Sequence, residues 1–305
     1  MHRPKVTVGV CVKNCENTIG EAIESIINQD YPHDFMEIIF VDDGSSDDTL
    51  SIIMDYVSKI DLNAKVFHHK WRGVGYSRNV VVKNATGEYI VWIDGDMTIP
   101  PNYVRKLVEF MENHPKVGIA KGKQSLQIGP SLLGKLEAYS RAASRMVNYQ
   151  SKKTRFKSLG TGGAIYRMKA LKHTGGFDET MRGYYEDFDI EIRVKALGWT
   201  LDIVDIDFCD HERKGLDFRG IWKRYWLRGY FGHYFLHKNK GAVKVYKMSP
   251  LVGLFAGLLD AVKLYPSTGR KAVFLLPILY LFKMFAWNLG FLASHLDNYE
   301  PNCGM

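Results

Sequence analysis

The chain has 305 residues, enough for one large domain or for one domain with an appendage, and its composition is that of a globular protein. Its four cysteines show neither paired zinc-ligand spacing nor a dense disulfide pattern, which excludes a disulfide-stapled scaffold and favours a reducing compartment. The net charge of +8 is concentrated in residues 121–157 and 213–247, with nine and ten basic residues against one acid each. Such clustering predicts an anionic partner (nucleic acid, a phosphate-rich substrate or anionic lipid) or a solvated basic face.

Apolar strand runs alternate with amphipathic helical segments over the first hundred residues. We expect strands at 6–12, 37–41 and 64–68, a further strand ending at Ile93, and helices at 18–29, 48–60 and 76–85. This alternation, with short connections, predicts a parallel sheet covered by helices on both faces. In such sheets ligands bind beyond the carboxyl ends of the strands.

The pattern changes after residue 101. We expect a helix at 102–113, a strand at 117–121, a basic amphipathic stretch at 132–149, an apolar run at 164–166, a helix at 186–197, a strand at 199–207 and an aromatic, basic helix at 219–238.

A pair of acids, Asp94 and Asp96, follows the apolar run at 88–93 with one glycine between them. Mg²⁺ and Mn²⁺ prefer oxygen ligands and often take only one or two from protein, which leaves positions for substrate phosphate. Asp-Gly-Asp is also ordinary turn chemistry. Its place at the end of a predicted strand favours a metal site for a nucleoside diphosphate.

Two more acids, Asp42 and Asp43, follow the strand predicted at 37–41. We expect at least one of them to accept hydrogen bonds from a base or ribose. Farther along, Gly73 begins a glycine pair before a helix, where backbone amides can approach an anion. Arg78 either contributes to that anion site or braces the sheet through a carboxylate such as Asp43.

The pair Glu186 and Asp187 opens a predicted helix within an aromatic, acidic stretch. Acids are favoured at the start of any helix by its dipole. A partly buried carboxylate near a metal can also act as a general base. Beyond this helix, His211 is either an additional metal ligand or a structural histidine.

Two apolar segments lie near the end of the chain. Residues 272–294 carry Lys283 as their only charge and, as a helix, are long enough to cross roughly 30 Å of hydrocarbon. If the shorter segment at 251–265 also spanned, Arg270 and Lys271 would face outside, against the positive-inside rule. We therefore expect the first segment to lie at the membrane interface and the second to be inserted, with a soluble helical subdomain or dimer contact as the alternative.

Taken in order, these motifs resemble those of the family 2 nucleotide-sugar glycosyltransferases, which have the GT-A fold. The matching residues are 6–10 with Asn14 and Glu16, then 41–49, 73–79, 85–89, 94–96, 175–178 and 186–187, so the resemblance covers residues 5 to about 200. Residues 11–14 read Cys-Val-Lys-Asn and depart from the family's usual Pro-x-Tyr-Asn. That departure leaves the base contact and the choice of nucleotide open.

The resemblance implies an α/β fold of GT-A type with a mostly parallel central sheet, plus a C-terminal hydrophobic helical region. The catalytic domain would cover residues 1–240, and a membrane-associated helical region would cover residues 241–305.

The resemblance also implies roles for particular residues. The donor nucleotide would be bound by Asp42, Asp43, Gly73, Arg78 and Asp94, and the metal, Mg²⁺ or Mn²⁺, by Asp94 and Asp96 with His211 as a further candidate. Asp187 would deprotonate the acceptor hydroxyl. The acceptor or the diphosphate would lie near Thr161, Gly162, Gly163, Glu186, Arg224 and Arg228, although the two arginines can equally belong to a basic helix on lipid headgroups.

The expected activity is an inverting, metal-dependent transfer of a sugar from a UDP- or GDP-sugar to a hydroxyl of a lipid-linked or cell-surface glycan, at the cytoplasmic face of the cell membrane. An alternative is transfer to a polyprenyl phosphate, whose anionic acceptor needs no base. A sugar nucleotidyltransferase is less favoured, because residues 13–17 lack the glycine-rich loop that such enzymes need. Nucleic acid is not an expected partner; a nucleic-acid-binding or scaffold protein would tolerate the loss of Asp96.

Overall fold

The computed structural model describes residues 3–125, 131–150, 158–210 and 217–298. Its contacts divide the chain into two compact units. The first contains Met1–Ser125, Lys153–Arg182 and Glu186–Glu212, and the second contains Leu126–Lys152, Gly183–Tyr185 and Arg213–Met305. The described strands all belong to the first unit, and the second is helical.

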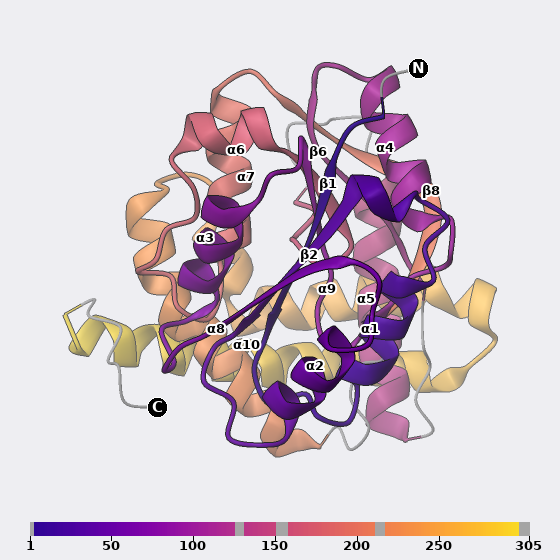
Figure 1. Ribbon diagram of the computed structural model, residues 1–305. Coiled ribbons are helices and arrows are strands. Elements are labelled where there is room, and N and C mark those ends of the chain that lie inside the picture. Colours follow the sequence, from indigo (N-terminus) through magenta and orange to yellow (C-terminus); the bar gives the residue numbers. More distant parts are fainter. Residues whose placement is uncertain (1–2, 126–130, 151–157, 211–216, 299–305) are drawn as a thin grey trace. The chain divides into compact units, whose positions relative to one another are not determined.

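The first unit is built on a mixed sheet with the strand order β3-β2-β1-β4-β7-β6-β8-β5. Strands β1, β2, β6 and β8 of this sheet are labelled in Figure 1. The strands are β1 (Val6–Val12), β2 (Met36–Asp42), β3 (Asn63–His68), β4 (Tyr89–Trp92), β5 (Met97–Thr98), β6 (Val117–Gln124), β7 (Ala164–Arg167) and β8 (Thr200–Asp210). Strand β1 pairs in parallel with β2 and β4, as do β2 with β3 and β6 with β8. The pairs β4–β7, β6–β7 and β5–β8 are antiparallel. The predicted α/β fold with a mostly parallel sheet is confirmed, and the antiparallel insertion of β7 is an addition that the sequence pattern did not indicate.

Helices cover both faces of this sheet. They are α1 (Ile19–Ile27), α2 (Thr49–Val57), α3 (Val74–Asn84), α4 (Tyr103–Asn113), α6 (Met168–Thr174) and α7 (Glu186–Ala196), with the 3₁₀ turn η1 (His33–Phe35) before β2. One apolar core joins the sheet to α1, α2 and α4, and a second core joins it to α3, α6 and α7. In Figure 1 these two groups of helices lie to the right and to the left of the strands.

The alternation of side chains along β2 shows why both faces need cover. Ile38 and Phe40 belong to the core with α1 and α4, whereas Ile39 and Val41 belong to the core with α3 and α7. Successive residues of a strand point to opposite faces, so a strand that is apolar throughout must be buried on both sides. All seven residues of β2 are buried. The polar groups are consequently confined to the strand ends.

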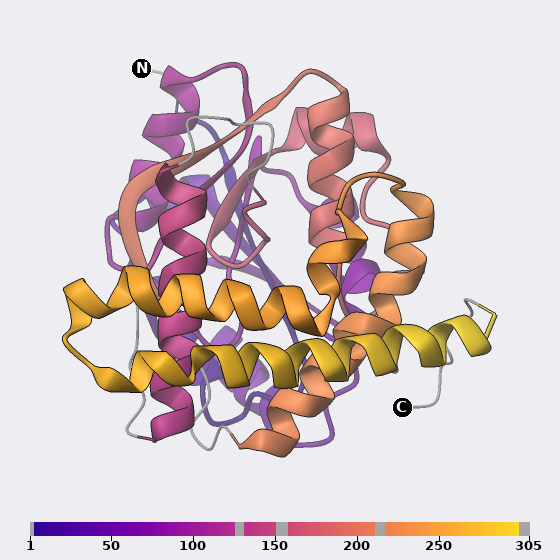
Figure 2. The same cartoon turned by 180° about the vertical axis from the view of Figure 1, so that it is seen from behind.

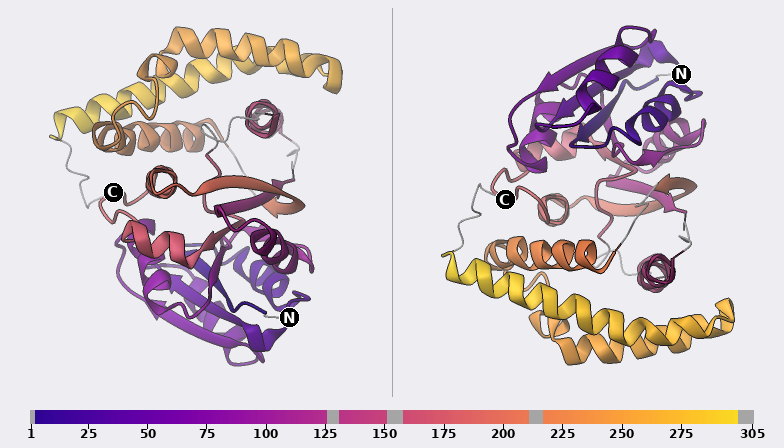
Figure 3. Two further views of the ribbon diagram at one scale, coloured as in Figure 1. Left: turned by 90° about the horizontal axis from the view of Figure 1, so that it is seen from above. Right: turned by 90° about the horizontal axis from the view of Figure 1, so that it is seen from below.

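The second unit consists of helices. They are α5 (Leu132–Gln150), α8 (Phe218–Lys238), α9 (Pro250–Thr268) and α10 (Leu276–Leu296), with the 3₁₀ turns η3 (Val245–Met248) and η4 (Lys271–Leu275). Helices α9 and α10 lie side by side, as the views in Figures 2 and 3 show. Within the described parts of the chain, one helical stretch, Lys271–Leu296, is long and apolar enough to cross a membrane by length and composition.

Candidate active site

Acidic side chains gather beyond the carboxyl ends of β2 and β4, the edge at which the sequence predicts a site. Asp42 is the last residue of β2, and its side chain is inaccessible to solvent. It accepts hydrogen bonds from the Ser45 amide and hydroxyl and lies 2.7 Å from His68 Nδ1. This carboxylate is therefore occupied by its own loop and by β3.

Asp43 follows and is also buried. It accepts hydrogen bonds from the Arg72 amide (2.7 Å) and the Gly73 amide (3.0 Å). Burial raises the pKa of Asp43, although these amide hydrogen bonds oppose the shift. The sequence predicts an anion at the Gly73 amide. In the structure the carboxylate of Asp43, at the start of α3, takes that place.

Gly73 has a backbone conformation and a position that only glycine fits. Its φ is +95°, and a Cβ added there would lie 2.6 Å from the Arg182 backbone. We expect Gly73→Ala to reduce the free energy of unfolding by about 1–3 kcal/mol, since strain and steric overlap add. Gly198→Ala is the matched control, with φ +86° and open space around it. Equal losses of thermal stability in the two variants would show that the contact with Arg182 is unimportant.

Arg78 is the buried cation of the site. Its guanidinium contacts the Glu186 carboxylate at the start of α7, and only 8% of its side-chain surface is exposed. Burial lowers the pKa of Arg78, but the charges of Glu186, Asp94 and Asp187 outweigh it and keep the pKa above its usual value. Arg78 is paired with a carboxylate, as one of the two alternatives drawn from the sequence expects, but that carboxylate is Glu186 from a distant part of the chain and not Asp43.

The loop at residues 159–162 lies between two carboxylates. A Cβ added to Gly162 would lie 2.5 Å from Asp94 Oδ2, and one added to Gly160 would lie 3.2 Å from Asp187 Oδ2. Thr161, between them, is buried. Three segments that the sequence singled out separately are therefore brought together.

Asp94 and Asp96 lie after β4, and the Asp94 carboxylate has other charged groups, Arg78 and Asp96, near it. Asp94 follows β4, and burial raises its pKa, with a further contribution from the charge of Asp96 and an opposing one from Arg78. The two acids are thus close enough to influence each other. Among the described residues no group of three or more His, Cys, Asp or Glu side chains is placed to hold a metal. A pair of hard oxygen donors fits a cation that completes its coordination with phosphate and water.

Glu191 is a buried acid of α7 that sequence reasoning missed. Its Oε1 accepts hydrogen bonds from the Leu159 amide (2.8 Å) and the Gly160 amide (2.6 Å). Lys121 Nζ donates to the Leu159 carbonyl at 2.6 Å. These contacts hold the 159–162 loop beside Asp187. The available signal was the position of Glu191 one helical turn after Asp187, on the same face of the predicted helix.

The ionisation of Glu191 should make stability depend on pH. Burial, with the charge of Asp187, raises the pKa of Glu191 to about 7 from a usual 4.5. The protonated form is therefore favoured by folding, and its contribution is lost as the pH rises from about 4.5 through 7. We expect Glu191→Gln to gain up to about 3 kcal/mol relative to wild type between pH 5 and pH 8. Thermal unfolding across this range measures the difference, with the exposed Glu109→Gln as a control that should show no such trend.

Of the remaining predicted site residues, Gly163 directly follows the 159–162 loop, where its amide donates to the Trp92 carbonyl and it adjoins the Phe208 ring. Arg224 and Arg228 belong to the second unit, where Arg224 lies 3.9 Å from Glu137 and the Arg228 guanidinium lies over the rings of Tyr184 and Tyr225. His211 lies outside the residues that the structure describes.

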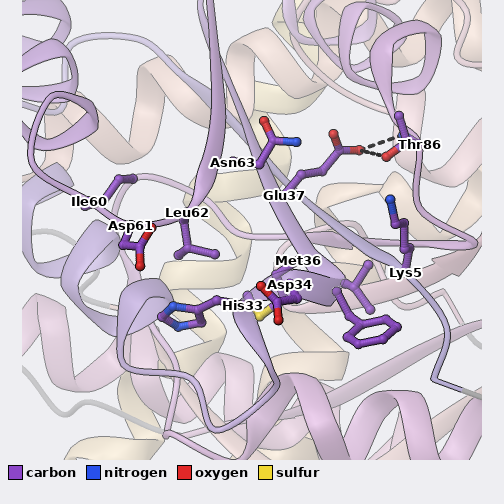
Figure 4. A pocket seen from close by; sticks show the side chains of 12 residues that line it. Lys5, His33, Asp34, Met36, Glu37, Ile60, Asp61, Leu62, Asn63 and Thr86 are labelled. Atoms are coloured by element: carbon purple, nitrogen blue, oxygen red, sulfur yellow. Dashed lines mark hydrogen bonds between the residues drawn. The ribbon is translucent and has the colours of Figure 1, made fainter.

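A hollow also occurs at the opposite, amino-terminal ends of β1 to β3 (Figure 4). Its lining includes Glu37, whose Oε1 accepts hydrogen bonds from Thr7 and Thr86 and whose Oε2 accepts one from Lys65. The carboxylate is thus fully engaged in joining β1, β2 and β3. The hollow does not share residues with the strand-end site.

A family model described as "Glycosyl transferase family 2" matches residues 7–175. The chain belongs to glycosyl transferase family 2. This membership confirms the resemblance drawn from the motifs.

Curated relatives of this family 2 chain include two bacterial proteins. It is 26% identical over 199 residues to the poly-beta-1,6-N-acetyl-D-glucosamine synthase of Staphylococcus epidermidis. The aligned segment covers 62% of this chain and 48% of that protein. It is 38% identical over 112 residues to the putative glycosyltransferase EpsE of Bacillus subtilis. Here the aligned segment covers 36% of this chain and 40% of that protein. The chain spans about half the length of these relatives.

Two solved structures share the fold of this family 2 member. The mannosyltransferase PcManGT of Pyrobaculum calidifontis, in complex with GDP-Man and Mn²⁺, matches with a TM-score of 0.64 and 19% identity over 98% of this chain and 88% of that chain. TarS 1–349 of Staphylococcus aureus, in complex with UDP-GlcNAc, matches with a TM-score of 0.56 and 19% identity over 96% and 92%. These likenesses confirm the GT-A type fold.

Proposed function

We propose that this family 2 member is an inverting glycosyltransferase that uses Mg²⁺ or Mn²⁺ to move a sugar from a UDP- or GDP-sugar to a hydroxyl of a lipid-linked or cell-surface glycan. The observation that carries the proposal is the 159–162 loop, with the Asp94 carboxylate against Gly162 and the Asp187 carboxylate against Gly160. A transferred sugar beside this loop would have a donor phosphate side and an acceptor side, which is what a single in-line displacement requires.

The donor side is supplied by Asp94 and Asp96, which would hold the metal. When bound there, Mg²⁺ or Mn²⁺ neutralises the charge that develops on the departing nucleoside diphosphate. The buried carboxylates of Asp42 and Asp43 shape the adjoining loops, and with Gly73 and Arg78 they would form the nucleotide end of the site. Arg78 also balances the negative charge of Glu186 and Asp94, which favours keeping this acidic cluster folded.

The acceptor side is supplied by Asp187. Its Oδ1 accepts a hydrogen bond from the Phe188 amide at 2.7 Å, which fixes the carboxylate while Oδ2 faces Gly160. Oδ2 would accept the proton of the acceptor hydroxyl as that oxygen attacks the sugar on the face opposite the diphosphate, with inversion. Glu186 is the less suitable base, because it is paired with Arg78.

The similar proteins suggest which donors to test first. TarS was solved with UDP-GlcNAc and PcManGT with GDP-Man, and another relative is a poly-N-acetylglucosamine synthase. We include residues 1–240 in the catalytic domain and place the region 241–305 at the cytoplasmic face of the cell membrane. Arg224 and Arg228 would then serve the acceptor or its headgroups, and His211 is a further candidate ligand of the metal.

The test is transfer from UDP-GlcNAc, UDP-glucose and GDP-mannose to membrane lipids and glycan acceptors, with and without chelator. We expect one donor to be used, activity to vanish on chelation, and the product to have the anomeric configuration opposite to that of the donor by NMR. Absence of metal-dependent transfer to any acceptor would contradict the proposal. Transfer only to a polyprenyl phosphate would replace the hydroxyl acceptor by a phosphate.

A further inference from the structure

Helices α9 and α10 expose an unusual amount of apolar surface. Of the eighteen large hydrophobic side chains exposed among the described residues, thirteen lie between positions 251 and 296. Eleven of them form two outward stripes, one along each helix: Leu251, Phe255, Leu258, Leu259, Val262 and Tyr265 on α9, and Ile278, Phe285, Leu289, Leu292 and Leu296 on α10; Phe274 and Leu275 lie in η4 between them. Contiguous apolar surface of this kind marks a membrane or protein interaction site.

The opposite faces of both helices are buried against other helices of the second unit, in an apolar cluster. Helix α9 packs on α5, and α10 packs on α5 and α8. The contact between α8 and α10 is so close that a Cβ on Gly229 would overlap the Trp287 carbonyl, and one on Gly290 would overlap the Trp226 carbonyl. Since α8 carries four Arg or Lys residues between positions 219 and 228, it is unsuited to hydrocarbon. The outward stripes therefore lie on the side away from the α5 and α8 layer.

The middle of α10 is tied to this layer through Lys283. Only 3% of Lys283 is exposed, and its ammonium pairs with Glu137 and donates to Ser140 Oγ at 3.1 Å, both on α5. A helix crossing the bilayer along its whole length would have to break this pair and leave both charges without their partner in low dielectric. The sequence alone favoured insertion of 272–294; the contacts of Lys283 favour an α10 that keeps one face on protein.

Basic residues flank α9 in the sequence and lie on its surface. Lys240 and Lys244 stand in the segment between α8 and α9, Lys263 lies on α9, and Arg270 and Lys271 follow it; all five are exposed. Between positions 240 and 296 the sequence has one acid, Asp260. Its carboxylate accepts a hydrogen bond from Tyr280 across the two helices at 2.9 Å. Apolar stripes flanked by cations complement a bilayer with anionic headgroups.

We propose that the α9–α10 hairpin lies flat on an anionic bilayer, with its outward stripes immersed at the boundary between headgroups and acyl chains and with neither helix crossing. The inference rests on the membrane association within the proposed function and is independent of the transfer chemistry. The two ends of α10 then stay on the same side of the membrane. The first unit, which contains the candidate active site, remains in the aqueous compartment that contains both ends of α10.

The first experiment is flotation of the full chain with vesicles of phosphatidylcholine, alone or with phosphatidylglycerol. We expect binding to the anionic vesicles, and at least about a tenfold loss of binding in the double variant Phe255→Glu, Leu289→Glu. The control is Met54→Glu, Leu197→Glu, which places two charges at similarly exposed apolar positions of the first unit. Equal flotation of the two double variants would overturn the proposal.

The second experiment separates a flat hairpin from a spanning helix. A protease site is inserted between Gly269 and Arg270, a cleavable tag is added after the last residue, and sealed inverted membrane vesicles are treated with protease. We expect both sites to be cut without detergent. Protection of one of them until detergent is added would show that α10 crosses and would overturn the proposal.

Two further readouts complete the test. One outcome would assign the outward stripes to a second copy of the chain and overturn the proposal. In it, wild type forms a dimer without lipid, the double variant Phe255→Glu, Leu289→Glu does not, and neither protein floats with vesicles. Transfer activity is measured in detergent for the same variants and should be kept. Because Asp187→Asn should float like wild type, failure of the chemistry and failure of the membrane contact are distinguishable.

Discussion

Asp187→Asn should lower the rate of transfer to a hydroxyl acceptor by about 10²–10⁴-fold, because the amide cannot accept the acceptor proton. Asparagine keeps the shape of the side chain and the acceptor for the Phe188 amide. Folding and donor binding should therefore be unchanged. The measurement is kcat and KM for both substrates, with thermal unfolding as a check that the protein is intact.

Asp205→Asn is a suitable control, since Asp205 is an acid of the same unit whose side chain is 92% exposed. It should retain wild-type activity. Full activity of Asp187→Asn with a hydroxyl acceptor would rule out Asp187 as the base. Full activity only with a polyprenyl phosphate, which is already an anion, would favour the alternative acceptor.

Asp96→Ala should reduce transfer at saturating donor by at least about 10²-fold and raise the concentration of Mn²⁺ needed for half-maximal rate. The reason is that the cation would lose one of its two protein carboxylates. Asp96 is only partly buried and precedes the short strand β5, so the variant should fold. Rates over a titration of Mn²⁺ and Mg²⁺ measure the effect.

The exposed Asp61→Ala removes an acid at the opposite, amino-terminal edge of the same sheet and should leave the metal dependence unchanged. Wild-type rates and an unchanged Mn²⁺ requirement in Asp96→Ala would exclude Asp96 from the metal site. Such a result would leave Asp94 as the only candidate carboxylate of the pair.

Much of the first unit could be predicted because its signals are local. The apolar run at 6–12 is strand β1 with the same limits, and the helix predicted at 102–113 differs from α4 by one residue. The convergence of Asp42 and Asp94 follows from parallel topology, which places strand ends along one edge. The predicted roles of these acids remain predictions, but their gathering at this edge is confirmed.

The features that the sequence does not predict depend on contacts between distant parts of the chain. Arg78 pairs with Glu186, 108 positions away, and no spacing rule selects that acid over Asp43. The sequence pattern does not indicate helix α6, because the helix has only seven residues and follows β7 directly, and its apolar residues are fixed by the core with α3 and α7. In the sequence, Lys283 is a single charge in an apolar segment. In the structure it pairs with Glu137, which disfavours a position of this segment across a membrane.

The claim that Asp96 holds a divalent metal on a sugar-nucleotide diphosphate is tested most directly by binding. Titration calorimetry of UDP and GDP is performed with and without Mn²⁺, on wild type and on Asp96→Ala. We predict that Mn²⁺ strengthens the binding of one diphosphate to wild type by at least about tenfold and leaves Asp96→Ala almost unaffected. Equal strengthening in both proteins, or metal-independent binding to wild type, would contradict the account.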